Sequence, residues 1–284
     1  MSEQIVRKQT FRGKVAVIPG GSKGIGRAAA REFVMRGGSV CVIARGKDAL
    51  KQTRAELESL RTQGAAQFVE TISADTTDMK KLKPALEKFI KQKGVPDYLI
   101  NCVGYAYPQY IEKMSLADFQ KNMDINYYGQ LVPILIMLPH FMKEKRGHIA
   151  NVSSMMGYFG IMGYAAYAPT KFALVGLTEV LRHELKPYNI ACSILYPPDT
   201  DTPGYEVENR TKPKECAIMS EKAKLMSADD VGAAFIEGII KKRFSILPGE
   251  AGLIWRIFRH FPGLVRWIID GDYTKARKRI GRKI

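Results

Sequence analysis

The chain has 284 residues, of which 46% are hydrophobic and 25% are charged. This composition excludes global disorder, a collagen, a coiled coil and a disulfide scaffold. Lysine and arginine number 44 against 28 acidic residues, a formal net charge of +16, so we expect an anionic partner: a phosphorylated cofactor, a membrane surface or a nucleic acid.

Neither a transmembrane helix nor a secretory signal is expected, because no run of 18 apolar residues occurs and residues 1–14 are polar. Cys41, Cys102 and Cys192 lie in apolar runs, and Cys216 lies in a polar stretch. We interpret the cysteines as thiols in a reducing compartment, which favours the cytoplasm. They lack metal-ligand spacing and the four histidines do not cluster, so no metal is expected.

Short apolar runs alternate with longer stretches of helical periodicity. The runs are 15–18, 40–43, 66–69, 98–100, 148–152, 190–195 and 244–247. Between them, apolar residues spaced about 3.6 apart, as in 28–35 and 50–60, predict helices. Strands that alternate with helices form βαβ units with right-handed crossovers. We therefore predict one α/β domain over residues 1–250, with a doubly wound parallel sheet of the Rossmann type.

A glycine-rich turn joins the first predicted strand to the first helix. Gly20 permits the turn, Gly24 lets the backbone approach a pyrophosphate, and Gly26 lets the helix pack closely on the strand. Amide groups at the helix N-terminus then face the anion. The turn predicts a dinucleotide site, although a plain glycine-rich turn is the alternative. Its other expected contacts are Ser22, Lys23 and Ile25.

The end of the second predicted strand indicates which dinucleotide binds. Enzymes that use NAD place an acidic residue there, about 20 residues beyond the glycine turn, to bind the ribose. Here Arg45 and Lys47 occupy the region, and Lys23 lies in the turn itself. Basic side chains, with no carboxylate at the end of the strand, suit a 2′-phosphate, so we predict NADP(H). In the alternative interpretation, Arg45 is only a surface residue.

A tyrosine and a lysine carry the expected chemistry. Tyr167 and Lys171 are four residues apart at the start of a predicted helix and share one face. An ammonium group beside a phenol lowers the pKa of the phenol toward neutrality, which makes Tyr167 a usable general acid for a ketone. Ser154 ends the preceding predicted strand.

Together these features resemble the short-chain dehydrogenase/reductase family over about residues 12–248. The resemblance implies that Tyr167 donates the proton, that Lys171 lowers its pKa and holds the nicotinamide ribose, and that Ser154 orients the carbonyl. It also implies that Asn126 fixes Lys171 through a water molecule. Many family members are dimers or tetramers, which predicts a homo-oligomer here.

The resemblance assigns further residues to the cofactor. Asp75 would contact the adenine and Asn101 would lie beside the cofactor. Two residues depart from the family pattern, Pro19 in place of Thr and Val103 in place of Ala, and neither removes a catalytic group. The remaining expected cofactor contacts follow the sixth strand and are Pro197, Thr200 and Thr202.

Residues 197–227 break the alternation of strands and helices and are rich in Pro, Thr and charge. After a strand of an open α/β sheet, such a loop lines the ligand crevice, so we predict a mobile lid over the substrate; a mobile surface loop is the alternative. Asp199 and Asp201 are expected near the active site, where one carboxylate could pair with a substrate amine. A turn or helix-capping role is the alternative for both.

The stretches YPPDTDTPGY at 196–205 and ENRTKP at 208–213 resemble the 3-ketosphinganine reductases, as does ELKPYN at 184–189. This resemblance implies NADPH-dependent reduction of 3-ketosphinganine to sphinganine, with a proton from Tyr167. The alternatives are another lipophilic ketone, such as a steroid or 3-oxoacyl group, and a non-catalytic dinucleotide-binding protein. Eukaryotic members carry an N-terminal hydrophobic anchor, which we do not find here, so membrane attachment would need another route.

Residues 251–284 form a predicted amphipathic extension. Residues 253–284 contain nine basic and two acidic residues, and their two tryptophans lie among Leu, Ile, Phe and Arg. This is the composition of an interfacial helix on an anionic membrane. Because Pro262–Gly263 interrupts the apolar stretch, we predict two short helices on a membrane surface, and no nucleic-acid site. Packing on the core or on a partner subunit is the alternative.

Overall fold

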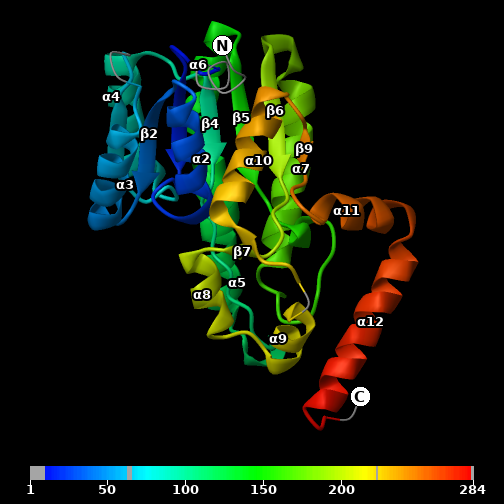
Figure 1. Ribbon diagram of the computed structural model, residues 1–284. Helices are drawn as coiled ribbons and strands as arrows, with labels where there is room; N and C mark the ends of the chain where they lie inside the picture. Colours follow the sequence, from blue (N-terminus) through cyan, green and yellow to red (C-terminus); the bar gives the residue numbers. More distant parts are fainter. Residues whose placement is uncertain (1–9, 63–65, 222, 283–284) are drawn as a thin grey trace.

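The structure is a computed structural model, and it describes residues 10–62, 66–221 and 223–282. Within these residues a parallel sheet of seven strands forms the centre, in the order β3-β2-β1-β4-β5-β6-β9 (Figure 1). The strands are β1 (Val15–Pro19), β2 (Ser39–Ala44), β3 (Val69–Ser73), β4 (Tyr98–Asn101), β5 (Gly147–Val152), β6 (Ile190–Leu195) and β9 (Ser245–Ile246). The strand order reverses at β1 and β4, which is where an open α/β sheet binds its ligands.

Helices cover both faces of this sheet. Side chains of α2, α3 and α10 share one buried core with the sheet, and side chains of α4, α6 and α7 share the other. The arrangement confirms the predicted doubly wound α/β fold. The helices are α2 (Gly24–Met35), α3 (Lys47–Ser59), α4 (Met79–Lys93), α5 (Leu116–Met123), α6 (Gly129–Glu144), α7 (Ala168–Glu184) and α10 (Ala228–Ile240).

The third strand lies three residues beyond its predicted place at 66–69. The amide of Gln67 is buried and donates to the carbonyl oxygens of Val34 and Gly38, at 2.9 and 2.8 Å. This side chain ties its segment to the end of α2, so the ladder begins only at Val69, opposite Val40. Apolar character alone does not reveal such a polar tether.

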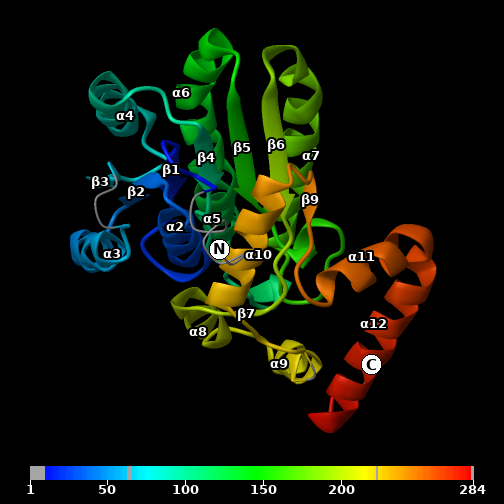
Figure 2. The ribbon, with the colours of Figure 1, turned by 45° about the horizontal axis from the view of Figure 1, so that its top comes forward.

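Residues 197–227 are more regular than a loop. They contain the helices α8 (Pro203–Asn209) and α9 (Lys214–Ser220) and a small sheet of β7 (Thr200–Asp201) and β8 (Met226–Ser227). Figure 2 shows them beyond the carboxyl ends of the central strands. The hydroxyl oxygen of Thr202 accepts from the Tyr205 amide at 3.1 Å and so caps α8.

The C-terminal extension forms α11 (Ala251–His260) and α12 (Pro262–Arg279). Pro262 begins α12, as expected from a residue that is favoured in the first helical turn. The predicted break is therefore confirmed, but α12 has 18 residues and is not short. Figure 1 shows α12 running beside the body of the molecule toward the level of α9. In the described part of the chain, no helix is both long and apolar enough to cross a bilayer.

Candidate active site

The glycine turn leaves a cradle in front of α2. Gly20 has a φ of +77°, and a Cβ atom on it would lie 2.7 Å from the backbone of Cys102. Gly24 has a φ of +50°, and a Cβ atom there would lie 3.0 Å from Thr202 Cγ2. Side chains at these positions would collide with Cys102 after β4 and with Thr202, so the turn has to be bare backbone. A bare turn at the start of a helix fits a pyrophosphate.

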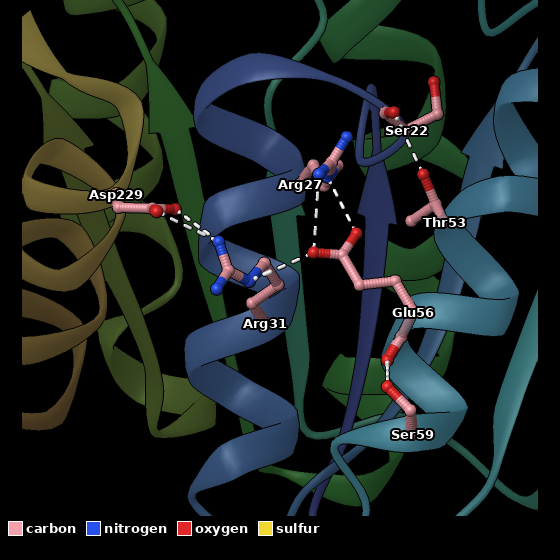
Figure 3. Close-up of polar contacts among 7 residues, drawn as sticks. All are labelled: Ser22, Arg27, Arg31, Thr53, Glu56, Ser59 and Asp229. Atoms are coloured by element: carbon pink, nitrogen blue, oxygen red, sulfur yellow. Dashed lines mark hydrogen bonds and ion pairs between the residues drawn. The ribbon is translucent and has the colours of Figure 1, made fainter.

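Neighbouring helices hold this turn in place (Figure 3). The Thr53 hydroxyl of α3 donates to the Ser22 carbonyl at 3.0 Å. Arg31 of α2 pairs with Glu56 of α3 at 3.2 Å and with Asp229 of α10 at 2.8 Å. Three helices are thus connected around the start of α2, which keeps the cradle in one shape.

One large cavity opens at the carboxyl ends of the strands, with a volume of about 880 Å³. This size lies within the range of small-molecule and cofactor pockets. Most of the residues that the sequence predicts for the site line it together. They are Gly20, Ser22, Lys23, Gly24, Ile25, Gly26, Arg45, Asp75, Ser154, Tyr167, Lys171, Pro197, Thr200 and Thr202.

Three predicted residues do not line the cavity. Lys47 is the exposed first residue of α3. Asn101 is buried behind the wall, where its amide donates to the Asn151 side chain at 2.9 Å. Asn126 is buried in the π-helix Asp124–Tyr128 and binds both backbone groups of Tyr105, accepting at 2.7 Å and donating at 2.8 Å.

Asn126 nevertheless faces the same small space as Lys171. A Cβ atom on Gly104 would lie 3.5 Å from Lys171 Nζ and 3.6 Å from Asn126 Oδ1. A π-helical turn inside helical structure often marks a functional site, because it redirects a side chain. The geometry therefore brings Asn126 near Lys171 and away from the cavity wall.

An exposed cation lies at the end of the cavity beside β2. The Arg45 side chain is 70% exposed, and its Nη1 atom lies 3.6 Å from Asp75 Oδ2. The other Asp75 oxygen accepts from the amide and the hydroxyl of Thr77, at 2.9 and 2.8 Å. Asp75 is thus held in place, whereas Arg45 remains accessible to an anion.

The side chains predicted to be catalytic come together from the segment after β5 and from the start of α7. Lys171 is buried, and its Nζ atom donates to the Val152 carbonyl at 3.1 Å. The same atom lies 5.4 Å from the centre of the Tyr167 ring. The Ser154 hydroxyl oxygen accepts from the Met156 amide at 3.1 Å, and Ser154 and Tyr167 both line the cavity.

A family model described as short chain dehydrogenase matches residues 14–213. The chain belongs to the short-chain dehydrogenase family. It is therefore an oxidoreductase with a nicotinamide dinucleotide as its cofactor. A solved 3-oxoacyl-[acyl-carrier protein] reductase with bound NAD from Brucella melitensis is similar, with a TM-score of 0.68 and 25% identity over 82% of this chain and 86% of that chain.

Curated relatives are more similar in sequence. The 3-ketodihydrosphingosine reductase of Dictyostelium discoideum is 38% identical over 251 residues, which cover 83% of this chain and 75% of the relative. The 3-dehydrosphinganine reductase of Danio rerio is 35% identical over 243 residues, which cover 85% and 73%.

The pKa values of this short-chain dehydrogenase site differ from the expectation. Burial raises the pKa of Tyr167, the charges of Glu208 and Asp199 raise it further, and the hydrogen bond with Ser154 opposes them. Burial also lowers the pKa of Lys171 to about 7. The expected lowering of the tyrosine pKa by the lysine is therefore wrong in this structure, because burial dominates both groups. Tyr167 remains a protonated phenol, the form that a general acid requires.

Sequence reasoning missed a polar cluster beside Tyr167. The Tyr164 hydroxyl donates to Glu208, and Lys212 Nζ lies 3.4 Å from the same carboxylate. Tyr205 donates to Asp199 at 3.3 Å. Both carboxylates line the cavity. The available signal was helical spacing, since 205 and 208 lie on one face of α8.

Asp201 does not join this cluster. It is exposed in β7 and does not line the cavity. Alternation in a strand sends successive side chains to opposite sides, and the neighbouring Thr200 is buried against the cavity wall. The expectation that Asp201 lies near the active site is therefore wrong, whereas the one for Asp199 is confirmed.

Proposed function

We propose that the chain is an NADPH-dependent 3-ketosphinganine reductase, which converts 3-ketosphinganine to sphinganine in sphingolipid biosynthesis. The observation that carries this proposal is the arrangement of Ser154, Tyr167 and Lys171 in a cavity that also extends along apolar side chains. The similar 3-ketodihydrosphingosine and 3-dehydrosphinganine reductases, whose alignments cover most of this chain, support the same substrate class.

NADPH is the proposed cofactor, and it supplies the hydride when bound. The glycine turn would hold its pyrophosphate, and Lys171 its nicotinamide ribose. Lys23 and Arg45 would pair with the 2′-phosphate, because both line the cavity and β2 ends without a carboxylate. Asp75 lines the same end of the cavity and would contact the adenine.

The chain's own residues would perform the proton transfer. Ser154 would orient the ketone by a hydrogen bond to its oxygen. Tyr167 would donate its phenolic proton to that oxygen as the carbonyl carbon accepts the hydride, so the ketone becomes an alcohol. Asn126 would act through Lys171, since both face the space beside Gly104.

A 3-oxoacyl substrate is the second candidate, because the similar solved structure is a 3-oxoacyl reductase. An assay of pure protein with NADPH and with 3-ketosphinganine, a ketosteroid and a 3-oxoacyl thioester separates the candidates. We expect the highest kcat/KM for 3-ketosphinganine. A higher kcat/KM for the thioester or the steroid would replace the proposal.

The outer faces of α11 and α12 support peripheral contact with an anionic membrane. Leu253, Phe261 and Trp267 are exposed, Trp267 by 72%. Arg256 and Arg266 lie beside them and are exposed too. Tryptophan with arginine on an exposed helix suits the headgroup region, where each basic side chain contributes about 1 kcal/mol.

Homo-oligomerisation through α6 and α7 completes the proposal. Both helices cover the same face of the sheet, and both expose large apolar side chains: Leu135 on α6, and Phe172 and Val180 on α7. Light scattering of the wild type and of Val180→Asp tests this face. We expect a dimer or tetramer that dissociates in the variant, and an unchanged mass would remove α7 from the interface.

A further inference from the structure

The cavity does not end at the catalytic tyrosine, because the C-terminal extension forms part of its wall. Ile254 and Ile257 of α11 line it, as do Val265, Ile268 and Ile269 of α12. Their spacing of three or four residues places them on one stripe of each helix. The extension therefore presents an apolar face to the same cavity that holds the proposed cofactor site.

The opposite wall is built from the body of the enzyme. Met219 of α9 lines the cavity, and so do Phe159 and Ile161 before α7. The ring of Phe258 in α11 packs against Phe159, with centroids 5.9 Å apart. Carboxylates and hydroxyls gather near Tyr167, whereas the part beside the extension is lined mostly by aliphatic side chains, with Ser220, Glu250 and Asp272 as its polar residues. The cavity is thus polar near Tyr167 and mostly apolar beside the extension.

An ion-pair cluster around a buried carboxylate fixes the far end of α12 against α9. Glu215 of α9 is fully buried and accepts from the Tyr110 hydroxyl. Arg282 donates to Glu215 at 3.2 Å and to the Tyr110 oxygen at 3.1 Å, and Arg277 lies 3.8 Å from Glu215. We name Tyr110, Glu215, Arg277 and Arg282 the Glu215 clasp. A second pair, Arg279 with Glu221, joins the same two segments at 2.5 Å.

We propose that α11 and α12 form the binding site for the alkyl chain of the substrate, with α12 held in place by the Glu215 clasp. This inference rests on the proposed function for the identity of the substrate. A keto-sphingoid base has a polar head and one long alkyl chain, and the cavity has the matching order of polar and apolar walls. Burial of each methylene group favours binding, so the wall sets a preference for chain length.

Chain-length dependence of kcat/KM tests the alkyl site. With 3-ketosphinganines of decreasing chain length, the wild type should lose about fourfold per methylene removed from the contact. Ile269→Trp and Ile257→Trp each narrow the apolar part, so each should lose at least tenfold on the longest chain and less than twofold on the shortest. Leu116→Trp is the matched control, since Leu116 is exposed on α5 and lies outside the cavity wall. It should behave as wild type on every chain.

Glu215→Gln tests the clasp separately. A weaker hold on α12 should raise KM for the longest chain and leave kcat unchanged, because the catalytic residues lie on other elements. NADPH binding and thermal unfolding of each variant show whether it is folded. Equal losses on long and short chains, or a wild type indifferent to chain length, would overturn the alkyl site.

The proposed function can fail independently of this site. If only 3-oxoacyl thioesters are reduced, the assignment to ketosphinganine fails. The alkyl site then still predicts that kcat/KM for the thioesters depends on their chain length, and that Ile269→Trp removes this dependence. If ketosphinganine is reduced equally well at every chain length, the alkyl site fails and the proposed function stands.

Discussion

The Nζ atom of Lys171 lies 5.4 Å from the centre of the Tyr167 ring and donates its hydrogen bond to the carbonyl oxygen of Val152. The lysine is thus fixed by Val152, the last residue of β5, which lies two residues before Ser154. Ser154 follows the same strand end, so the end of β5 places Ser154 and Lys171 on the same side of the cavity as Tyr167.

Tyr167→Phe tests the proton donor. The variant loses the phenolic proton but keeps the ring, so kcat should fall by about 10²- to 10⁴-fold while NADPH affinity stays close to wild type. Initial rates and NADPH fluorescence titration measure the two effects. Lys171→Ala should reduce both, because the lysine also serves the ribose. Near-normal turnover by Tyr167→Phe would show that the proton comes from another group.

The lowered pKa of Lys171 links stability to pH. Burial is the main cause, and it brings the pKa from 10.5 to about 7, whereas the interaction with Cys102 acts in the opposite direction. Between these values the unfolded chain holds a proton that the folded chain has released, so the free energy of unfolding rises with pH. The stability gained in this way is present above about pH 10.5 and is lost as the pH falls to about 7.

Lys171→Met removes this dependence. The unfolding free energy of the wild type, relative to that of the variant, should therefore rise as the pH increases from about 7 to 10.5. Urea unfolding at both ends of the window measures it. Lys275→Met, at an exposed position of α12, is the control and should follow the wild type. Parallel pH profiles for wild type and Lys171→Met would contradict the lowered pKa.

Cofactor choice depends on Arg45 and Lys23. A hydrogen bond between a cation and a phosphate contributes about 1.5–3 kcal/mol, so loss of one should weaken NADPH relative to NADH by about 10- to 150-fold. Arg45→Asp should thus shift kcat/KM toward NADH, and Lys23→Ala should shift it in the same direction. Lys47→Ala is the control, since Lys47 does not line the cavity. A wild type that uses both cofactors equally well would refute the NADP assignment.

Recognition of a substrate amine is expected from Asp199. Its carboxylate lines the cavity and receives a 3.3 Å hydrogen bond from Tyr205, whereas Glu208 is already paired with Lys212. Asp199→Asn should lower kcat/KM about tenfold or more for 3-ketosphinganine and much less for an uncharged ketone of equal length. Asp201→Asn should change neither. Equal losses on both ketones in Asp199→Asn would eliminate amine recognition.

The sequence predicted the central fold well because its signals are local. Six of the seven strands lie at the apolar runs that predicted them, and the glycine turn follows directly after the first of these runs. The third strand was displaced by the Gln67 side chain, which acts through contacts 29 and 33 residues away. Such a tether between distant segments has no periodic signature.

The site was predicted less completely for the same reason. Ser154 follows one strand, and Tyr167 and Lys171 lie at the start of one helix. Their spacing along the chain therefore predicts that they belong to one site. Glu208 belongs to the cluster only because Thr202 caps α8 and turns that helix toward Tyr164. The role of α12 as a wall depends on Glu215 and Arg282, which are 67 residues apart. Neither relation can be obtained from spacing along the chain.

Membrane contact can be separated from the alkyl site because the two use different faces of the same helices. Leu253→Ser with Trp267→Ser changes exposed side chains outside the cavity wall. The double variant should lose at least tenfold in affinity for anionic liposomes, since two large apolar groups no longer enter the headgroup region. Its kcat/KM for a short-chain ketosphinganine in solution should remain that of wild type.

Sedimentation with liposomes that contain phosphatidylserine measures this contact, and Leu116→Ser is the matched control for an exposed leucine elsewhere. Deletion of residues 251–284 should abolish both sedimentation and chain-length preference, because it removes the outer and the inner face together. Undiminished sedimentation of the double variant would contradict membrane contact through the exposed face of α11 and α12, since its side chains would then not be the ones that enter lipid.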